Sequence, residues 1–267
     1  LLGLLALLAS TTMAAAPLRV VSMAPSMTEI MLELHAGDLL VGVLDGGERP
    51  GALAALPSVG RQGQLNIERL VGLQPDLLLL WPGSIGPAQR DQLKRLGIET
   101  FSAEPRTVDQ LIGQIEAIGQ QVGRGEEGRR YAQALRQRLQ QLRQQYQRRE
   151  PLQVFYQVWD QPLYTLGGRQ VVSDALAVCG ARNVFADLSL PAPQVSVEAV
   201  LARNPQVIVA GDQAQLAGWK RWPQLRAVAD QRLLVVPDKG LERPSGQMIE
   251  ATARLCALLA AKAPASR

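Results

Sequence analysis

The residue types that most often carry out catalysis are sparse in this 267-residue sequence. His35 is the only histidine, and it lies near the end of a predicted helix, where a surface or capping role is usual. The sequence contains no G-x-S-x-G, H-E-x-x-H or P-loop motif, and no His, Cys and carboxylate residues with metal-site spacing. No two carboxylates form a recognisable acid–base pair. These observations favour a binding function, without metal or cofactor, over catalysis.

The first 16 residues have the pattern of a secretory signal peptide. The apolar run LLGLLALLAS is followed by the small residues of TTMAAAP, as in an h-region and its cleavage site. The run is shorter than the about 18 apolar residues of a transmembrane anchor, and no Cys follows it for a lipid anchor. We expect cleavage near 14–16, and a segment clipped at its start because an initiator Met and a basic n-region are missing. The mature protein is therefore predicted to be exported.

Export gives significance to the two cysteines, Cys179 and Cys256. An even pair in an oxidising compartment predicts a disulfide, and closing so long a loop is worth about 4 kcal/mol in the chain-entropy model. Two buried free thiols are the alternative. Both residues lie in apolar, helix-like segments, SDALAVCG and EATARLCALLA, so a disulfide would join two helices.

The formal net charge of +4 comes from one segment of the chain. Eight arginines lie between positions 124 and 149, and subtracting eight charges from +4 leaves −4 for all other residues. A nucleic-acid-binding protein would combine a basic patch with aromatic platforms or a reading motif, and neither is present. The run of arginines is interpreted as the solvated face of a helix.

Strand-like and helix-like segments alternate in residues 17–123. Alternation of this kind predicts an α/β domain with a mainly parallel sheet. We expect Ser26 or Thr28 to cap the first helix, with Gly37 just past its end, and Asn66 to cap the second. The Gly/Pro-rich segment 46–64 is predicted to be a loop with one turn of helix. Strands are predicted at 18–23, 39–44, 76–81 and 99–103, and helices at 26–38, 66–74, 87–97 and 107–123.

Residues 124–150 predict one long helix. Tyr131, Leu135, Leu139, Leu142 and Tyr146 recur at helical spacing on a surface rich in Arg and Gln. No Pro or Gly interrupts residues 129–150. At 1.5 Å per residue a helix of this length spans roughly 30 Å, so we expect it to lie across the molecule.

Alternation of strands and helices resumes in residues 151–267, and part of the first half recurs there. NIERLVGLQPDLLLLW, residues 66–81, corresponds to SVEAVLARNPQVIVAG, residues 196–211. Each copy is a capped helix with an early Glu, then a Pro, then an apolar strand. The sequence therefore predicts a signal peptide at 1–16 and two similar α/β lobes, 17–123 and 151–267, joined by one bridging helix at 124–150.

Two lobes create a cleft, and ligand sites favour such interfaces and the carboxyl ends of parallel strands. Trp81 and Gly211 end the repeated strands, while Trp159 and Tyr164 follow the first strand of the second half. We expect Trp81, Trp159 and Tyr164 to face the cleft; core packing or plain exposure is the alternative for each.

Longer segments of the sequence are similar to a known class of proteins. RVVSMAPSMTEIMLELHAGDLLVGV and LPSVGRQGQLNIERLVGLQPDLLLLW resemble the iron-siderophore, haem and vitamin B12 class of periplasmic binding proteins, in which one helix bridges two lobes. CGARNVFAD, APQVSVEAVLARNPQVIV and LERPSGQMIEATARLCALL resemble the vitamin B12 binders of that class. The resemblance covers essentially the whole mature chain. It implies a monomer in the periplasm that carries cobalamin or a related corrinoid, with a disulfide between Cys179 and Cys256.

The resemblance also implies a partner, the permease dimer of an inner-membrane ABC importer. In this class one Glu at the tip of each lobe docks to arginines of the permease, and Glu68 and Glu198 occupy the matching positions. Two related lobes would present two related charges to a two-fold-symmetric partner. The alternative is local, because a carboxylate near a helix N-terminus is also mildly stabilising.

The resemblance is weaker in the cleft. Vitamin B12 binders line it with aromatic residues, which Trp81 and Tyr164 match, whereas other aromatic positions hold Gly46, Gln62, Ala192 and Gly240. Less aromatic surface means less burial for a corrin ring, at about 25 cal/mol per Å². Basic residues of the predicted cleft loops are candidates to meet an anionic ligand, with solvated loop charge as the alternative; they are Arg49, Arg61, Lys239 and Arg243.

Haem and ferric siderophores are therefore the alternative ligands. PSVGRQGQL resembles the corresponding loop of haem carriers, which commonly place an iron-ligating Tyr where Arg61 stands. Arginine stays protonated and has no lone pair to offer iron, although it can pair with carboxylates. An exported enzyme on the same two-lobed scaffold is the alternative from another functional class.

Overall fold

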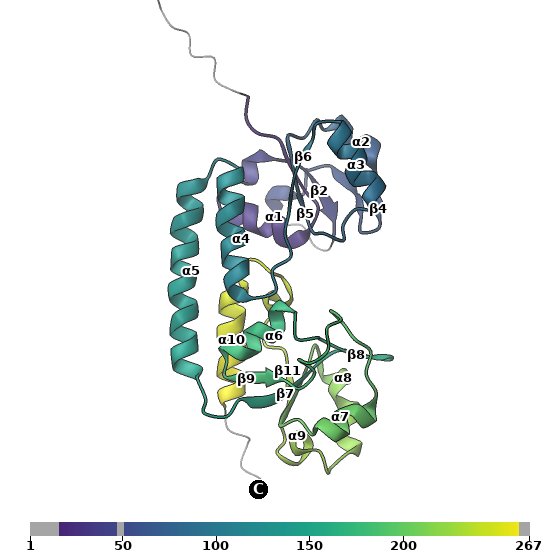
Figure 1. Cartoon of the computed structure of the whole chain (residues 1–267), viewed down its shortest axis with the longest axis vertical. Coiled ribbons are helices and arrows are strands. Elements are labelled where there is room, and N and C mark those ends of the chain that lie inside the picture. Colours follow the sequence, from purple (N-terminus) through teal and green to yellow (C-terminus); the bar gives the residue numbers. More distant parts are fainter. Residues whose placement is uncertain (1–15, 47–50, 262–267) are drawn as a thin grey trace, which may run out of the picture.

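The computed structural model describes residues 16–46 and 51–261. The predicted signal segment, apart from its last residue, and Arg49 lie outside these ranges. Two lobes lie one above the other, and the long helix α5 (Gly125–Tyr146) runs along one side of both (Figure 1). The predicted fold class, two similar α/β lobes with mainly parallel sheets and one bridging helix, is confirmed.

The N-terminal lobe is built on a six-stranded sheet with the order β4-β3-β2-β1-β5-β6. All neighbours are parallel except β3 and β4. The strands are β1 (Val20–Ser22), β2 (Leu40–Asp45), β3 (Ser58–Arg61), β4 (Gln64–Leu65), β5 (Leu77–Leu80) and β6 (Glu99–Ser102). The helices are α1 (Pro25–Glu33), α2 (Ile67–Gly72), α3 (Pro87–Arg95) and α4 (Val108–Gln121), with short 3₁₀ turns at Gly37–Leu39 and Gly51–Leu53.

The structure corrects two expectations for this lobe. Helix α1 begins at Pro25 after Ala24 and has no side-chain cap, because Pro is itself suited to the first helical position. It ends at Glu33, earlier than the predicted end at 38, and His35 just beyond it adopts the left-handed conformation (φ 52°). The segment predicted as a loop contains β3 and β4, which form a tight hairpin with Gly63 at φ +78° in its turn.

The C-terminal lobe has a sheet with the order β11-β10-β7-β8, and β9 also pairs with β7. Only the β7–β8 pairing is antiparallel. The strands are β7 (Leu152–Asp160), β8 (Leu163–Thr165), β9 (Ala181–Asn183), β10 (Val207–Ala210) and β11 (Leu233–Val235). The helices are α6 (Val171–Val178), α7 (Val197–Arg203), α8 (Gln213–Ala217), α9 (Arg226–Ala229) and α10 (Met248–Ala260), with 3₁₀ turns at Gly218–Arg221 and Lys239–Glu242.

One hydrophobic core extends through both lobes. Helices α4 and α10 lie end to end against α5 (Figure 1). The stripe predicted on α5 packs against them: Leu135, Leu139 and Leu142 are buried, and the flanking tyrosines are partly buried. The same cluster of contacting residues includes members of β1, α1, α4, β7, α6 and α10.

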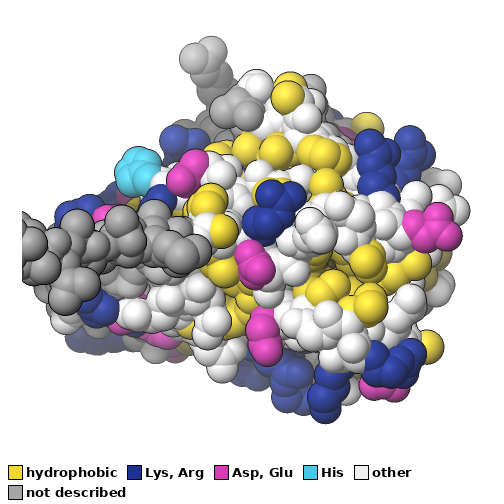
Figure 2. All heavy atoms as spheres, turned by 90° about the horizontal axis from the view of Figure 1, so that it is seen from above, with side chains coloured by type: hydrophobic (Ala, Val, Ile, Leu, Met, Phe, Trp, Pro, Cys, Tyr) yellow, Lys and Arg dark blue, Asp and Glu magenta, His cyan; other side chains and the backbone are white. Residues whose placement is uncertain are grey.

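The arginine-rich face of α5 is exposed, but it is also paired. Arg136 forms an ion pair with Glu116 on α4 at 2.6 Å, and Arg138 binds Glu250 on α10 at 2.8 Å. These exposed pairs are worth at most about 1 kcal/mol each. Seen from the end that carries the N-terminal lobe, acidic and basic side chains are scattered among uncharged and hydrophobic ones (Figure 2). The face seen in this view therefore carries no large patch of a single charge.

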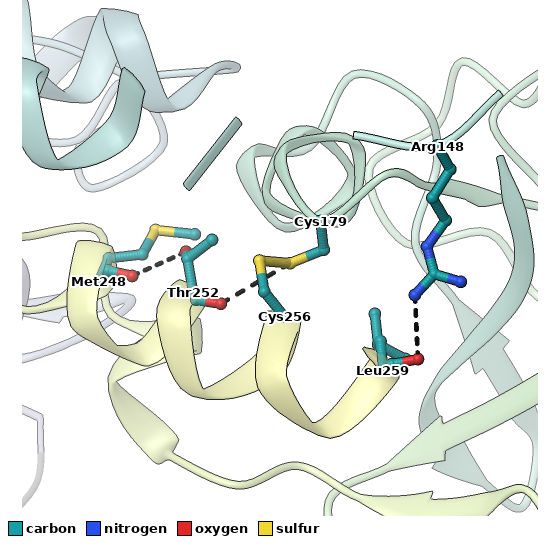
Figure 3. Close-up of a disulfide and its surroundings, with 6 residues drawn as sticks. All are labelled: Arg148, Cys179, Met248, Thr252, Cys256 and Leu259. Atoms are coloured by element: carbon teal, nitrogen blue, oxygen red, sulfur yellow. Dashed lines mark hydrogen bonds between the residues drawn. A yellow bond between two sulfur atoms is a disulfide. The ribbon is translucent and has the colours of Figure 1, made fainter. Parts of the chain in front are cut away.

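The predicted disulfide is present. Cys179, directly after α6, bonds to Cys256 in α10, and the two Cα atoms are 4.7 Å apart (Figure 3). Both residues are fully buried. Near the end of α10, Arg148 donates to the Leu259 carbonyl at 3.1 Å. The bond and this contact both hold the C-terminal half of α10 within the C-terminal lobe.

Candidate functional site

A cavity of about 550 Å³ lies between the two lobes. In the N-terminal lobe, its lining residues are at or just beyond the carboxyl ends of β1, β2, β5 and β6, where α/β sheets usually bind ligands. In the C-terminal lobe, β7, the start of α6 and residues 241–244 complete the wall. Most lining side chains are apolar and come from both lobes, among them Met23, Met27, Leu44, Trp81, Val158, Leu166 and Leu241.

Trp81 is the lining residue that the sequence identified most directly. It follows β5 and is 40 % exposed. A tight turn fixes its backbone, because the Ser84 amide donates to the Trp81 carbonyl at 2.8 Å and the Trp81 amide donates to Ser84 Oγ at 2.9 Å. The indole therefore offers a large apolar surface to the cavity from a rigid position.

The strand β7 contributes residues that the sequence analysis missed. Tyr156 and Val158 line the cavity, whereas Trp159 is 54 % exposed and does not. Successive side chains of a strand point to opposite faces, so the two alternate residues before Trp159 take the cleft-facing side. The alternation in LQVFYQVW could therefore have identified Tyr156 and Val158 as residues on one face of the strand.

Tyr164 is paired with Trp159 across the β7–β8 hairpin and does not line the cavity either. The Trp159 indole donates instead to the Gln161 carbonyl at 3.1 Å. Trp159 and Tyr164 both lie on the β7–β8 hairpin, next to the cavity-lining Val158. That they contact a ligand stays a prediction.

Two of the four positions where vitamin B12 binders have aromatic residues, but this chain does not, lie against the cavity. They are in the β3–β4 hairpin and at the end of β2. Gln62, in the hairpin turn, lines the cavity, but Arg61 beside it does not. Gly46 lines the cavity as well, and a Cβ there would lie 2.7 Å from Pro25 Cγ. A larger residue at position 46 would therefore require Pro25 to move. Ala192 and Gly240 are not part of the lining.

The charged lining of the cavity is acidic. Asp45, Glu104 and Glu242 line it, and no Lys, Arg or His from the described parts of the chain does. Arg61, Lys239 and Arg243 therefore do not form the expected basic lining. Arg243 is turned away to an ion pair with Glu29 at 3.0 Å. The interpretation that basic cleft loops face the ligand gains no support from these positions.

Two of the lining carboxylates are held by hydroxyl groups. The Tyr156 hydroxyl donates to Glu242 at 3.0 Å, and Ser58 Oγ donates to Asp45 at 2.5 Å. Burial, with the adjacent Glu242 charge, raises the pKa of Tyr156 well above its ordinary value of 10.0. Tyr156 therefore stays protonated and remains a donor, while the carboxylates offer acceptors to a ligand.

A polar cluster joins the lobes beside the cavity. Two carboxylates of α1 accept hydrogen bonds from the segment that leads into α10. Glu33 accepts from the amides of Gly246 at 2.9 Å and Gln247 at 3.0 Å, and Glu29 accepts from Ser245 Oγ at 3.1 Å as well as from Arg243. Burial raises the pKa of Glu33 above its ordinary value. The cluster thus ties the middle and the end of α1 to residues 243–247, which lead into α10.

Glu68 and Glu198 occupy equivalent places at the outer ends of the lobes. Asn66 caps α2 by accepting from the Arg69 amide at 2.9 Å, and Ser196 caps α7 by accepting from the Ala199 amide at 3.1 Å. Each Glu lies in the first turn of its helix and is exposed. Glu198 bonds its own amide and the Ser196 hydroxyl, which lowers the pKa of its carboxyl group.

The described residues show no group of three or more His, Cys, Asp or Glu side chains that could hold a metal ion. His35 is exposed and does not line the cavity. Within the part of the chain that the structure covers, no helix is both long and apolar enough to cross a membrane.

The matches to known proteins follow this architecture. Residues 20–239 match a family model described as periplasmic binding protein. The chain belongs to the periplasmic binding protein family. A vitamin B12-binding protein of Vibrio cholerae is 34 % identical over 244 residues, which cover 90 % of this chain and 88 % of that protein.

Solved structures agree with the assignment of the fold. The crystal structure of the periplasmic vitamin B12 binding protein BtuF of Vibrio cholerae matches this binding protein with a TM-score of 0.81 and 34 % identity, over 90 % of this chain and 96 % of that one. A periplasmic haem binding protein from Pseudomonas aeruginosa matches with a TM-score of 0.75 and 26 % identity, over 94 % and 95 %. The two-lobed scaffold is therefore shared by proteins named for different tetrapyrrole ligands.

Proposed function

We propose that this binding protein captures cobalamin or a related corrinoid in the periplasm and delivers it to an ABC importer. The observation that carries the proposal is the cavity between the lobes, with Trp81 and other apolar residues at strand ends and an acidic charged lining. The 34 % identity to a protein named for vitamin B12 supports the same ligand class.

The charge of the lining favours a corrinoid over haem or a ferric siderophore. A corrin ring has apolar faces and a rim of carboxamides, whose N–H groups donate to carboxylates such as Glu104 and Glu242. Haem carries carboxylates on its rim, and many ferric siderophores are anionic. Like charges placed together in a partly desolvated site are a strong means of rejecting the wrong ligand.

The test is a titration of the mature protein with cyanocobalamin, haemin and a ferric siderophore by isothermal calorimetry. We expect saturable one-to-one binding of cyanocobalamin with submicromolar Kd and no comparable binding of the other two. Of the four tryptophans, Trp81 alone lines the cavity. Fluorescence quenching by cyanocobalamin, corrected for its absorbance, should therefore decrease in Trp81→Phe.

Ligand recovery separates a carrier from an enzyme. Chromatography of the released ligand should return it unchanged after prolonged incubation. Binding of haemin or the siderophore in place of cyanocobalamin would contradict the corrinoid proposal while leaving the family assignment intact.

We further propose that Glu68 and Glu198 dock to arginines of the importer's permease dimer. Both carboxylates are exposed, lie in the first turn of equivalent helices and follow equivalent caps. Equivalent charges on two related lobes suit a two-fold-symmetric partner with one basic site for each lobe.

The docking proposal is tested with Glu68→Ala/Glu198→Ala. Uptake of labelled cobalamin through the reconstituted importer should fall to background, while the Kd for cyanocobalamin in solution stays unchanged. Glu99→Ala/Glu126→Ala removes the same charge from exposed positions elsewhere and should leave uptake intact. Loss of ligand affinity in the first variant would contradict the docking role.

A further inference from the structure

A second, more open cavity adjoins the first along helix α4. It lies between residues 103–106 and the face of α4 that carries Gln110, Gly113, Gln114 and Ala117. We refer to it as the α4 groove. The loop that forms its other wall is fixed at its base, because the Arg106 amide donates to Gln110 Oε1 at 2.8 Å.

The α4 groove and the main cavity share one wall. Ala103, Glu104, Pro105 and Gln114 line both. A ligand that fills the main cavity and extends beyond it on this side therefore passes directly into the α4 groove.

The charges on the two sides of this wall differ. The main cavity is lined by carboxylates, and none of its described lining residues is a cation. The α4 groove shares Glu104 with the cavity and adds Arg106, the one cation among its described lining residues. Arg106 is exposed, and its guanidinium forms no hydrogen bond or ion pair with the described residues, so its donors are open to a ligand. An anionic group would thus meet only carboxylates in the main cavity, whereas in the α4 groove it could pair with Arg106.

The shared wall also contains a buried polar atom that lacks a partner. Gln114 is 7 % exposed, its amide nitrogen contacts Met27 Sδ at 3.2 Å, and its Oε1 accepts no hydrogen bond from the described residues. Buried acceptors are normally satisfied. A ligand with amide donors at this wall would provide the missing bond.

A complete cobalamin exceeds the main cavity. Cavities of ~300–1,000 Å³ enclose drug-sized ligands, and cobalamin, with its corrin ring and nucleotide loop, is a far larger molecule than the 550 Å³ cavity encloses. The ring suits the apolar, acceptor-rich cavity. The nucleotide loop carries the phosphodiester, which is the ligand's anionic group.

We propose that Arg106 in the α4 groove binds the phosphodiester of the corrinoid's nucleotide loop and so distinguishes complete corrinoids from those without a nucleotide. The proposal rests on the proposed function and assigns a subsite to it. Arginine suits this role because its planar fork of N–H donors matches phosphate oxygens.

The experiment compares cyanocobalamin with dicyanocobinamide, which has the corrin ring but no phosphodiester. Calorimetric titrations at low ionic strength would use the mature protein, Arg106→Ala, Arg106→Lys and the control Arg95→Ala, an exposed arginine outside both cavities. For Arg106→Ala we expect Kd for cyanocobalamin to rise about tenfold, as for loss of one charge-assisted hydrogen bond. Kd for dicyanocobinamide should change less than about twofold.

The remaining variants and salt sharpen the result. Arg106→Lys should retain most of the affinity for cyanocobalamin, and Arg95→Ala should retain all of it. Added salt should reduce the effect of Arg106→Ala on Kd. Equal losses for both ligands, or no loss for cyanocobalamin, would overturn the subsite while leaving the proposed function standing. Absence of binding of either corrinoid to the unaltered protein would overturn both.

Discussion

The unit α2–β5 in the N-terminal lobe and the unit α7–β10 in the C-terminal lobe are alike at one end and different at the other. Each begins with a side-chain cap and an exposed Glu, and each ends in a four-residue strand that is completely buried. Beyond β5 the chain turns and presents Trp81 to the cavity, whereas no residue after β10 and before Lys239 lines it. The repeat therefore preserves the outer ends of the lobes, where docking is proposed, while the cleft-facing ends have diverged.

This difference matches the two tasks. A permease dimer with two-fold symmetry would require the two outer ends to be similar. A single asymmetric ligand does not require the two cleft-facing ends to be similar. The cavity is accordingly lined by the ends of four strands in one lobe and by β7, the start of α6 and residues 241–244 in the other.

The largest expected difference between the lobes concerns the disulfide, which lies within the C-terminal lobe. Cys179→Ala/Cys256→Ala should lower the free energy of unfolding by about 2–5 kcal/mol, because the unfolded chain loses its constraint. Urea denaturation followed by circular dichroism measures the change. A loss below about 1 kcal/mol would mean that packing around α10 holds this lobe without the covalent bond.

The helix caps test whether the shared ends are energetically equivalent. Asn66→Ala and Ser196→Ala each remove one hydrogen bond to an amide of the first turn, and each should cost about 1 kcal/mol. Equal losses in urea denaturation would support equivalence. Thr107→Ala provides a control, because this residue caps α4 outside the repeat and accepts from the Gln110 amide at 3.1 Å.

The turns between helix and strand should respond in opposite directions. Gln74 and Asn204 both precede a proline and both adopt the left-handed conformation, with φ of 45° and 42°. Asn tolerates this region better than Gln, and the Asn204 side chain also accepts from the Arg226 amide at 3.0 Å. Asn204→Gln should therefore cost up to about 1 kcal/mol, whereas Gln74→Asn should gain a few tenths, both measured by thermal denaturation.

The smallest expected effects concern the pH dependence of stability. One carboxylate in the N-terminal lobe has a raised pKa, and one in the C-terminal lobe has a lowered pKa. Burial raises the pKa of Glu33 above 4.5, so the folded state holds this proton more tightly, and stability falls as pH rises from about 4.5 through the folded pKa. The Arg203 guanidinium lowers the pKa of Asp187 below 3.8, so its contribution is present above 3.8 and lost as pH falls through the folded pKa.

Urea denaturation from about pH 3 to 7 detects these slopes. Glu33→Gln should remove the decline above pH 4.5, and Asp187→Asn should remove the loss at the acid end. Unchanged pH profiles in both variants would mean that other groups dominate the pH dependence of stability.

Local signals were sufficient for most of the fold. Asn66, Pro75 and the run Leu77–Leu80 define a cap, a stop and a buried strand within a few residues, and the structure has each in place. The hairpin of β3 and β4 was missed because its strands are short and contain glycine, which composition alone reads as a loop.

The candidate site was less accessible from sequence, because its charges are set by partners far along the chain. Arg243 looked available to a ligand, yet it pairs with Glu29, 214 residues away. Tyr156 and Val158 could have been found from strand alternation, whereas the position of Arg106 in the α4 groove depends on how its loop packs against α4.

The stripe of leucines on α5 has a consequence for how the chain folds. The hydrophobic cluster that contains it also includes Val20 and Ile30 near the beginning of the described chain and Leu255 and Leu259 near its end. Because this cluster draws members from both lobes and from the helix between them, we expect one cooperative unfolding transition instead of two. During synthesis this shared cluster is complete only once α10, the last helix of the described chain, has been made.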